Sequence, residues 1–351
     1  MLSGFCPHAF SQKPDSSNLN YNVIFGYALN ANAKEILKIL DTAKVVSQMD
    51  KKFKLKFENR FKYESDRTNY FVKPDTTLNP LNRIFQDYWR KSMLDNHTSY
   101  DKYFEKNLIT FLKAENQKTK FTNRKISAST IMKDVYPAYI LSKGFHGTKL
   151  GKTGNLYDLL VWKNETDTTY IIVLINDTAR VPVVMMKDFI SLGWEEYATL
   201  GAAFPGGWTT PDKLFCVRPS YDISSETFRV NYLSHEGQHF LDYKHFPKLS
   251  SNDLEYRAKL IELYLYDQEL YNYISFFISN ANYDKSNAHP YADFCVIRDM
   301  SRELFHTDFE KDMEKWQGKS KEEIHQAAKD LFLKNTESLN KLGKNVKEFV
   351  K

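Results

Sequence analysis

Apolar residues recur at helical spacing through much of the first third of the chain. In residues 33–49 they fall at intervals of three and four positions, with polar residues between them, which lines one face of a helix. Residues 80–114 repeat this pattern over a longer stretch, with a possible break near residues 97–99. We therefore expect the N-terminal region to be helical.

Near residue 126 the pattern changes to shorter runs. A helix through Tyr139 is expected first, followed by a glycine-rich turn over residues 144–154. The segments that have strand composition are residues 157–162, 169–175, 181–186 and 214–218. Polar residues 164–167 predict a hairpin turn between the first two strands, and residues 188–200 predict a helix. Strands followed by a run of helices indicate an α+β fold.

Two amphipathic helices are expected after the strands. The first covers residues 226–243, where candidate serine caps precede the apolar stripe and Pro247 follows it. The second begins near residues 251–253 and runs through Tyr264. The expected organisation is a flexible terminus or signal remnant (1–20), a helical region (21–125), and a domain with a small mixed sheet, the helix pair and C-terminal helices (126–351).

The first of these helices carries an H-E-x-x-H motif. His235 and His239 are four residues apart, so on a helix they lie on one face and can offer two imidazoles to one metal ion. Glu236 follows the first histidine, where its carboxylate can reach a metal-bound water. Zinc accepts such ligands, keeps a position open for water and lowers the pKa of that water to about 7. Two histidines packed in a core are the alternative explanation.

A carboxylate of the second helix is the expected third ligand. Glu255 lies sixteen residues after His239, which allows one helix to end, a loop to turn, and the next helix to pack beside the first. Asn252 and Glu255 also have the spacing of a capping box, in which the glutamate serves the helix end instead. Glu262 lies on the same helix face as Glu255 and is the reserve ligand.

The sequence resembles the gluzincin zinc metallopeptidases, the group that includes thermolysin-like enzymes. The matching positions are His235, Glu236, His239 and, as E-x-x-A, Glu255 with Ala258. The resemblance extends over about residues 208–298. It departs at Lys259, where a thermolysin-like enzyme carries an acidic residue that orients a histidine. Asp242 is a candidate for that outer-shell role.

The resemblance implies a zincin-like domain in which zinc is the cofactor, bound by His235, His239 and Glu255. Glu236 is then the general base, and a peptide or protein is the substrate, bound along a sheet edge formed by residues 206–217 or by the third strand. Gluzincins commonly stabilise the oxyanion with a downstream histidine or tyrosine. His289 and Tyr291 are the candidates here, and a surface loop without function is the alternative.

Other zinc chemistry stays open. His245 lies six residues after His239, as the third ligand of a metzincin would, although the glycine usual in that family is replaced by Asp242. The chain could also be a zinc hydrolase that cleaves a non-peptide amide or ester, or a binding protein that holds zinc without turnover.

Composition narrows these classes only in part. The net charge of +5 is too small to indicate a nucleic-acid partner. Residues 51–57 form the most basic stretch, in which lysines alternate with Phe and Leu. It could contact an anionic surface, although a solvated edge with its apolar residues turned inward is the favoured interpretation. Three separated cysteines predict neither a disulfide framework nor a cysteine metal site.

Membrane and export signals are weak in the sequence. The best apolar run, residues 170–175, has the length of a strand, so no transmembrane helix is expected. Ala9-Phe10-Ser11 before Gln12 is similar to the end of a cleaved signal, but a full apolar region is missing. This pattern slightly favours an exported protein over a cytoplasmic one.

Overall fold

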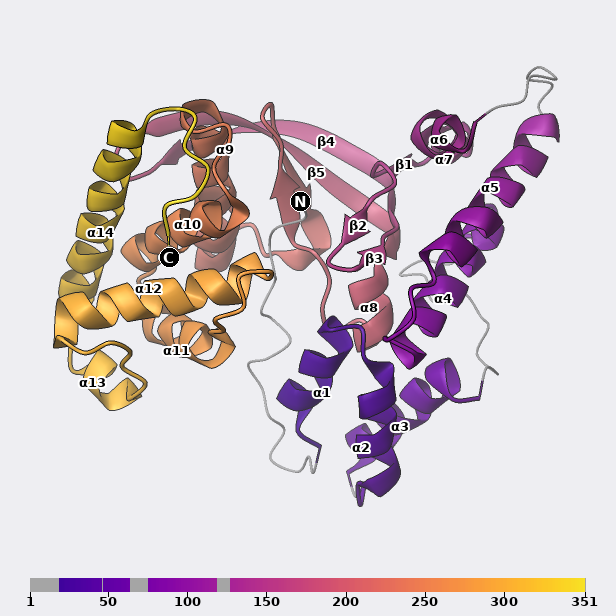
Figure 1. The fold of residues 1–351 in the computed structure, drawn as a ribbon, viewed down its shortest axis with the longest axis horizontal. Helices are drawn as coiled ribbons and strands as arrows, with labels where there is room; N and C mark the ends of the chain where they lie inside the picture. The colour runs from indigo at the N-terminus through magenta and orange to yellow at the C-terminus, as the bar shows by residue number, and fades with distance from the viewer. Residues whose placement is uncertain (1–18, 46, 64–74, 119–126, 351) are drawn as a thin grey trace. The chain divides into compact units, whose positions relative to one another are not determined.

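The structure is a computed structural model that describes residues 19–45, 47–63, 75–118 and 127–350 (Figure 1). It has the α+β fold that the sequence predicts. The chain forms two compact units: an N-terminal unit of residues 19–166 and 186–205, and a C-terminal unit of residues 167–185 and 206–350. These divisions differ from the expected boundary after residue 125. The expected terminal segment, residues 1–20, lies outside the described residues except for its last two.

The N-terminal unit is mainly helical. Its helices are α1 (Tyr21–Leu29), α2 (Ala33–Thr42), α3 (Gln48–Phe61), α4 (Asn79–Leu94), α5 (Asp101–Lys118), α6 (Ala128–Thr130), the π-helix Ile131–Val135, α7 (Tyr136–Ser142) and α8 (Trp194–Thr199). The break expected near residues 97–99 lies between α4 and α5. The stretch expected over residues 33–49 is two helices, because the Ser47 hydroxyl caps α3 by accepting the Asp50 N–H.

A five-stranded sheet has the order β1-β4-β5-β7-β6 and passes through both units, and β2 pairs with β3 separately. The strands are β1 (His146–Gly147), β2 (Lys152–Thr153), β3 (Leu156–Tyr157), β4 (Leu160–Val173), β5 (Thr178–Leu192), β6 (Gly207–Thr209) and β7 (Leu214–Val217). The pairs β1–β4, β2–β3 and β6–β7 are antiparallel.

The prediction of a hairpin turn at residues 164–167 is wrong. These residues lie inside β4, and the turn falls later, where the Leu174 N–H donates to the Asp177 carbonyl. Residues 163–167 are all exposed, so both faces of the strand meet solvent there. Polar composition at this point reflects exposure of an extended strand and not a reversal of the chain.

The prediction of a helix over residues 188–200 is also largely wrong. Strand β5 continues through Leu192, and only α8 is helical. Asp188 has a left-handed φ of 54°, which interrupts the regular strand, and its carboxylate accepts a hydrogen bond of 2.6 Å from Asn164 on β4. Asp adopts this conformation more readily than most residues because its side chain hydrogen-bonds locally.

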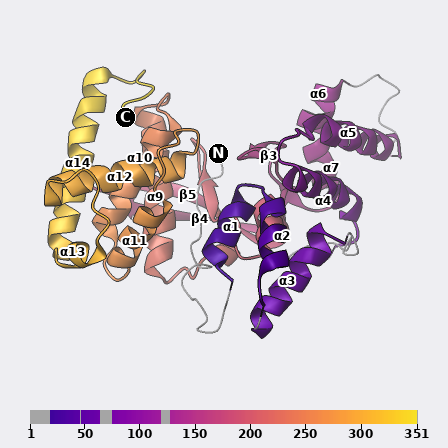
Figure 2. The same ribbon diagram turned by 60° about the horizontal axis from the view of Figure 1, so that its bottom comes forward.

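The C-terminal unit is built around one helix, α10 (Ser251–Leu265). Every residue of α10 from Asp253 to Leu263 is buried. Its neighbours include α9 (His235–His245), α12 (Ala288–Phe305) and α14 (Lys321–Leu342), and α11 (Leu270–Asn280) and α13 (Met313–Gln317) complete the unit (Figure 2). The helix expected over residues 226–243 is present, but its first part, Phe228–Ser234, is a π-helix.

Two glycines allow the strands to approach the motif helix closely. A Cβ on Gly237, inside the H-E-x-x-H motif, would lie 2.8 Å from Ile172 Cδ1 of β4. A Cβ on Gly207 of β6 would lie 2.4 Å from the Phe215 carbonyl oxygen and 2.5 Å from the Tyr232 ring. The absence of a side chain at these positions lets α9 and its π-helical approach lie directly against the sheet.

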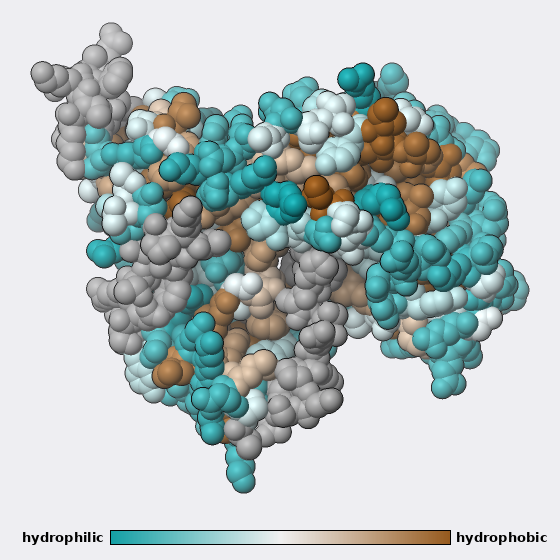
Figure 3. All heavy atoms as spheres, turned by 180° about the vertical axis from the view of Figure 1, so that it is seen from behind, coloured by the Kyte–Doolittle hydropathy of each residue, from teal (hydrophilic) through white to brown (hydrophobic). Residues whose placement is uncertain are grey.

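The opposite face of this part of the sheet carries exposed apolar side chains. Ile172 faces α9, so its neighbours Ile171 and Val173 point the other way, and they are 74% and 67% exposed. Figure 3 shows apolar side chains gathered on this side of the C-terminal unit. Among the described residues, no helix has the length and hydropathy needed to cross a membrane.

Candidate metal centre

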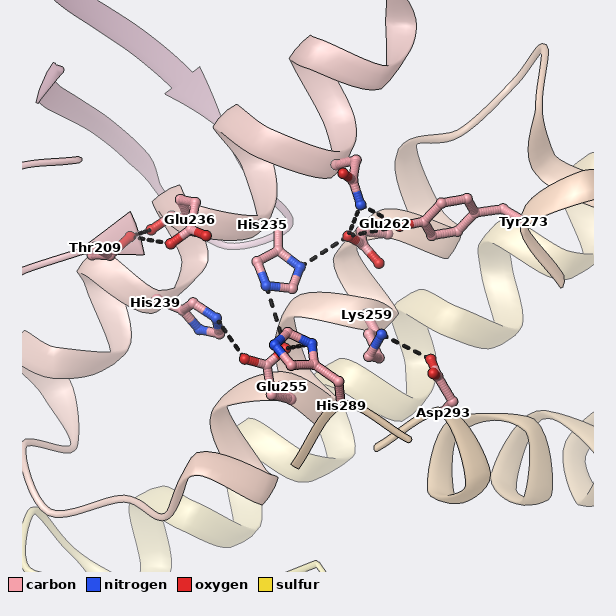
Figure 4. A network of polar contacts seen from close by, with 11 residues as sticks. Thr209, His235, Glu236, His239, Glu255, Lys259, Glu262, Tyr273, His289 and Asp293 are labelled. Atoms are coloured by element: carbon pink, nitrogen blue, oxygen red, sulfur yellow. Dashed lines mark hydrogen bonds and ion pairs between the residues drawn. The ribbon is translucent and has the colours of Figure 1, made fainter. Parts of the chain in front are cut away.

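Three candidate ligands converge inside the C-terminal unit (Figure 4). His235 and His239 lie one turn apart on α9, with ring centroids 4.6 Å from each other. Glu255 comes from the first turns of α10, and its two carboxylate oxygens lie 3.4 Å from the Nε2 atoms of His235 and His239. One donor atom of each residue lies within 4.8 Å of the other two. The spacing predicted from the sequence therefore brings the three residues together.

The donor atoms of this cluster fit a divalent cation. All three side chains are buried. Among the described residues, the facing atoms His235 Nε2 and Glu255 Oε2 have only each other, at 3.4 Å, and His289 Nδ1, at 3.0 Å from Glu255 Oε2, as polar neighbours. Buried polar atoms without partners are costly. Two imidazole nitrogens and one carboxylate are a ligand set of catalytic zinc sites. A zinc ion would replace these loose histidine–carboxylate contacts by metal–ligand bonds.

Glu262 holds the other nitrogen of His235. Its Oε1 lies 2.9 Å from His235 Nδ1 and accepts a hydrogen bond of 3.0 Å from the Asn231 amide. The Tyr273 hydroxyl lies 3.3 Å from the same oxygen and also contacts Asn231. Glu262, expected as the reserve ligand, thus contacts Nδ1 of His235, whereas Glu255 lies next to Nε2. With Nδ1 held in this way, Nε2 is directed towards His239 and Glu255.

Asp242, the outer-shell candidate, is engaged elsewhere. Its carboxylate accepts 2.9 Å hydrogen bonds from Arg257 and Gln238, and among the described residues it forms no hydrogen bond or ion pair with either histidine. Lys259, at the position where the resemblance implies an acidic residue, forms a buried 2.8 Å ion pair with Asp293 of α12. Glu262 therefore lies where an orienting carboxylate is needed, two helical turns beyond Glu255 instead of one.

The alternative positions for the third ligand are not part of the cluster. The N-cap of α10 is Ser250, whose hydroxyl accepts the Asp253 N–H, so Glu255 is not engaged in a capping box. His245 lies at the exposed end of α9, with its Nε2 3.8 Å from Asp177. The geometry matches Glu255 as the third candidate ligand and leaves His245 apart.

Glu236 is fully buried beside the cluster and faces the sheet. The Thr209 hydroxyl of β6 contacts the Glu236 carboxylate and lies 3.1 Å from the Glu236 backbone carbonyl. β6 is the last strand in the sheet order. Glu236, the candidate general base, therefore lies between α9 and the last strand of the sheet, which belongs to the expected edge segment 206–217.

His289 reaches the cluster, whereas Tyr291 does not. Both lie in the first turn of α12, which begins at Ala288, so they belong to a helix and not to a surface loop. His289 Nδ1 is 3.0 Å from Glu255 Oε2, and its side chain is 30% exposed. Tyr291 is buried next to Lys285, whose Nζ lies 5.4 Å from the ring centroid. Burial raises the pKa of Tyr291.

The electrostatics of the cluster are those of closely packed opposite charges. Burial alone lowers the pKa of His235, but the Glu262 and Glu255 carboxylates outweigh it and raise this pKa well above its usual value. Burial raises the pKa of Glu255, and His289 and His235 bring it well below its usual value. Without a metal ion, a proton on His235 takes the place of a cation between the two carboxylates.

Three residues of the site were not identified from the sequence: Thr209, Asn231 and Tyr273. Asn231 precedes His235 by four positions and is a buried polar residue on the same helical face, which is a usable signal. Thr209 and Tyr273 come from β6 and α11, and their contacts with the site depend on tertiary packing. Comparisons of the chain with protein-family models, curated protein sequences and solved structures find no match.

Proposed function

We propose that this chain is a zinc-dependent hydrolase that acts as a metallopeptidase. The observation that carries the proposal is the convergence of His235, His239 and Glu255, with the buried carboxylate of Glu236 next to them on α9. A structural zinc site usually has four protein ligands, whereas three ligands leave a position for water or substrate. The arrangement therefore favours a catalytic role over a purely structural one.

Each residue of the site has a proposed task. His235, His239 and Glu255 would hold the zinc ion, and Glu262 would keep the His235 ring in one tautomer. When bound, zinc supplies a Lewis acid and lowers the pKa of water. Glu236 accepts the proton of the attacking water and passes it to the leaving nitrogen.

His289 is the proposed donor to the oxyanion. Its side chain is partly exposed, unlike the buried ligands, so it can face a substrate at the mouth of the site. Its ring lies 6.4 Å from that of His235, nearly parallel to it. A donor at this place would hydrogen-bond the developing negative charge.

The edge position of β6 favours a peptide over a small ester. An extended peptide can add to the last strand of a sheet through backbone hydrogen bonds, and β6 is the last strand of this sheet. Thr209 of β6 touches Glu236, so a chain paired with this edge would pass the proposed general base. Apolar packing holds this edge in place, because Leu214 and Cys216 of β7, the strand paired with β6, are fully buried.

The test combines metal analysis with a digest of a mixed peptide library. The wild-type chain should contain about one zinc per molecule and cleave peptides. His239→Ala should lose the metal, whereas His245→Ala, on the same helix outside the cluster, should retain it. If both variants retained zinc, the proposed site would be disproved.

Glu236→Gln separates catalysis from metal binding. It should keep zinc and lose about 10²–10⁴-fold in rate, because the residue transfers protons and does not bind the metal. Bound zinc in a wild-type chain that cleaves esters or small amides but no peptide would assign the site to a non-peptide hydrolase. Bound zinc without any turnover would identify a binding protein.

A further inference from the structure

The net positive charge of the chain is concentrated in α2 and α3. Residues 33–62 contain nine lysine or arginine residues and four aspartate or glutamate residues. The difference, +5, equals the net charge of the whole chain, which has 49 basic and 44 acidic residues. The rest of the sequence is therefore balanced at 40 of each. The composition of the chain does not explain this local excess of positive charge.

Some of these lysines are neutralised within the N-terminal unit. Lys38 pairs with Glu35 at 2.7 Å, and Lys62 pairs with Asp41 at 2.7 Å. Three lysines of α3 have side chains without a hydrogen bond or ion pair to any described residue: Lys51, Lys52 and Lys56. Their charges are available to a partner outside the chain.

These three lysines share one face of α3 with exposed apolar side chains. At 100° per residue, Lys51, Lys52, Leu55 and Lys56 fall on the side opposite the buried Phe57 and Phe61. Leu55 is 58% exposed and Met49, at the edge of the same side, is 44% exposed. We call Met49, Lys51, Lys52, Leu55 and Lys56 the α3 face.

The inward side of α3 shows that this exposure is not a packing defect. Phe57 is fully buried and stacks with Phe53 at 5.8 Å and with Phe61 at 4.6 Å between ring centroids. Asp50 is buried and accepts a 2.9 Å hydrogen bond from the Tyr21 hydroxyl of α1. The helix is thus fixed in the unit by one side, and the α3 face is directed to solvent.

We propose that the α3 face binds the surface of an anionic lipid bilayer. Lysines attract anionic headgroups and can keep their charge at the interface while their aliphatic stems lie along apolar material. Leu55, between Lys51 and Lys52 on one side and Lys56 on the other, would enter the boundary between headgroups and acyl chains. This proposal is independent of the proposed function, because it concerns the N-terminal unit and no residue of the metal centre.

A bilayer fits the α3 face better than a nucleic acid does. Recognition of nucleic acids favours arginine forks and exposed aromatic rings that stack on bases. The α3 face has neither, since Arg60 is 5% exposed and the phenylalanines of the helix point inward or lie at the boundary. Exposed leucine and methionine would gain nothing from phosphate groups alone, but they gain from an apolar phase beneath a charged surface.

The experiment measures binding of the full chain to sedimented vesicles. Vesicles of phosphatidylcholine with about a third phosphatidylserine should bind the protein, and vesicles of phosphatidylcholine alone should bind much less. Replacement of Lys51, Lys52 and Lys56 by glutamine should lower the partition coefficient roughly a hundredfold, as expected for three charges near the surface. High salt should release the protein.

Matched variants separate the α3 face from net charge. Lys102, Lys106 and Lys113 are exposed lysines of α5, and their triple replacement by glutamine changes the charge equally but should leave binding within about twofold. Leu55→Ser should weaken binding, whereas Leu141→Ser, at a residue that is 66% exposed on α7, should not. Circular dichroism and the midpoint of thermal unfolding verify that each variant is folded.

Any of three results would overturn the proposal. One is equal binding of anionic vesicles by the wild type and by the α3 triple variant. Another is binding to duplex DNA or RNA that depends on the α3 lysines, without binding to either kind of vesicle, which would assign the α3 face to a nucleic acid. A wild type that binds no vesicle at low salt also disproves it.

Discussion

At the scale of single residues, Glu262 determines how the candidate ligands are presented. It is almost completely buried, and a carboxylate in that position must be paired. His235 Nδ1 at 2.9 Å and the Asn231 amide at 3.0 Å provide the partners. Because one nitrogen of the ring is held, the other is fixed in direction before a metal ion arrives.

We predict that Glu262→Gln weakens zinc binding about 10–100-fold, as the loss of an outer-shell carboxylate does. Glu255→Gln should weaken it far more, because it changes a direct ligand. Competition with a chromophoric chelator measures both affinities. Equal losses in the two variants would mean that Glu262 is itself a ligand, and an unchanged affinity in Glu262→Gln would remove its orienting role.

A second residue-scale prediction concerns Asp158 in the N-terminal unit. Burial raises the pKa of this carboxyl to about 6 from 3.8, although the backbone N–H groups of Trp194 and Leu159 lower it in part. Because the folded-state pKa is raised, the contribution of Asp158 to stability is fully present below pH 4 and is lost as the pH rises through 6. The shift of about two units corresponds to roughly 3 kcal/mol.

Asp158→Asn should remove this pH dependence. The amide can still accept the two backbone N–H groups through one oxygen, each bond being 2.9 Å long in the wild type. Relative to the wild type, the variant should gain about 3 kcal/mol in unfolding free energy between pH 4 and pH 8. Urea unfolding at both pH values measures it, with the exposed Asp134→Asn as the control. A difference that does not change with pH would refute the argument.

At the scale of elements, the sequence predicts helices better than strands. The helix pair that carries His235, His239 and Glu255 follows from the motif, the spacing and the helix boundary signals, and the structure brings all three residues together. Those signals are local. The buried face of a helix carries an apolar residue every three to four positions, so the sequence predicts the helix even when the element that packs against it is unknown.

The strands were predicted less well because their surroundings are not local. Residues 164–167 have turn-like composition but lie in β4, where both faces are exposed. Residues 188–200 were expected to be helical, yet β5 extends to Leu192. Residues 206–217 were expected as a candidate sheet edge, but β6 was not delimited within them, since its three residues gain their structure from pairing with β7. Thr209 could not be placed beside Glu236 without that pairing.

Gly207 provides the test at this scale. Gly207→Ala should destabilise the protein by about 1–3 kcal/mol or more, because the added Cβ meets a backbone carbonyl that cannot move aside without disturbing β7. Gly26→Ala, in α1, meets nothing within 4 Å and should be neutral or stabilising by up to about 1 kcal/mol. Thermal unfolding of both variants measures the two changes in stability. Equal changes would show that β6 does not need to lie so close to Phe215 and Tyr232.

At the scale of the whole molecule, the metal should stabilise one unit in particular. The candidate ligands all belong to the C-terminal unit, on α9 and α10. A ligand that binds only the folded state contributes about 4 kcal/mol at a concentration a thousandfold above its Kd. Buried contacts of α10 with α12 and α14 connect the centre to the rest of that unit.

We therefore predict that removal of zinc by a chelator increases amide hydrogen exchange in α9 and α10. Exchange in α4 and α5 of the N-terminal unit should change much less, because their core is formed by residues of that unit alone. Mass spectrometry of the exchanged chain, with and without zinc, measures both. A uniform increase over all helices would show that the metal stabilises the molecule as one cooperative body.

Residues 347–350 form hydrogen bonds with the start of α10. The N–H groups of Phe349 and Val350 donate to the Asp253 carboxylate at the start of α10, and the Ser250 N–H donates to the Lys347 carbonyl at 2.7 Å. Because a chain is synthesised from its N-terminus, α9 and α10 exist before residues 347–350 are added. The turn that presents Glu255 lacks these contacts until then, which makes the candidate metal centre a part of the nascent C-terminal unit that matures late.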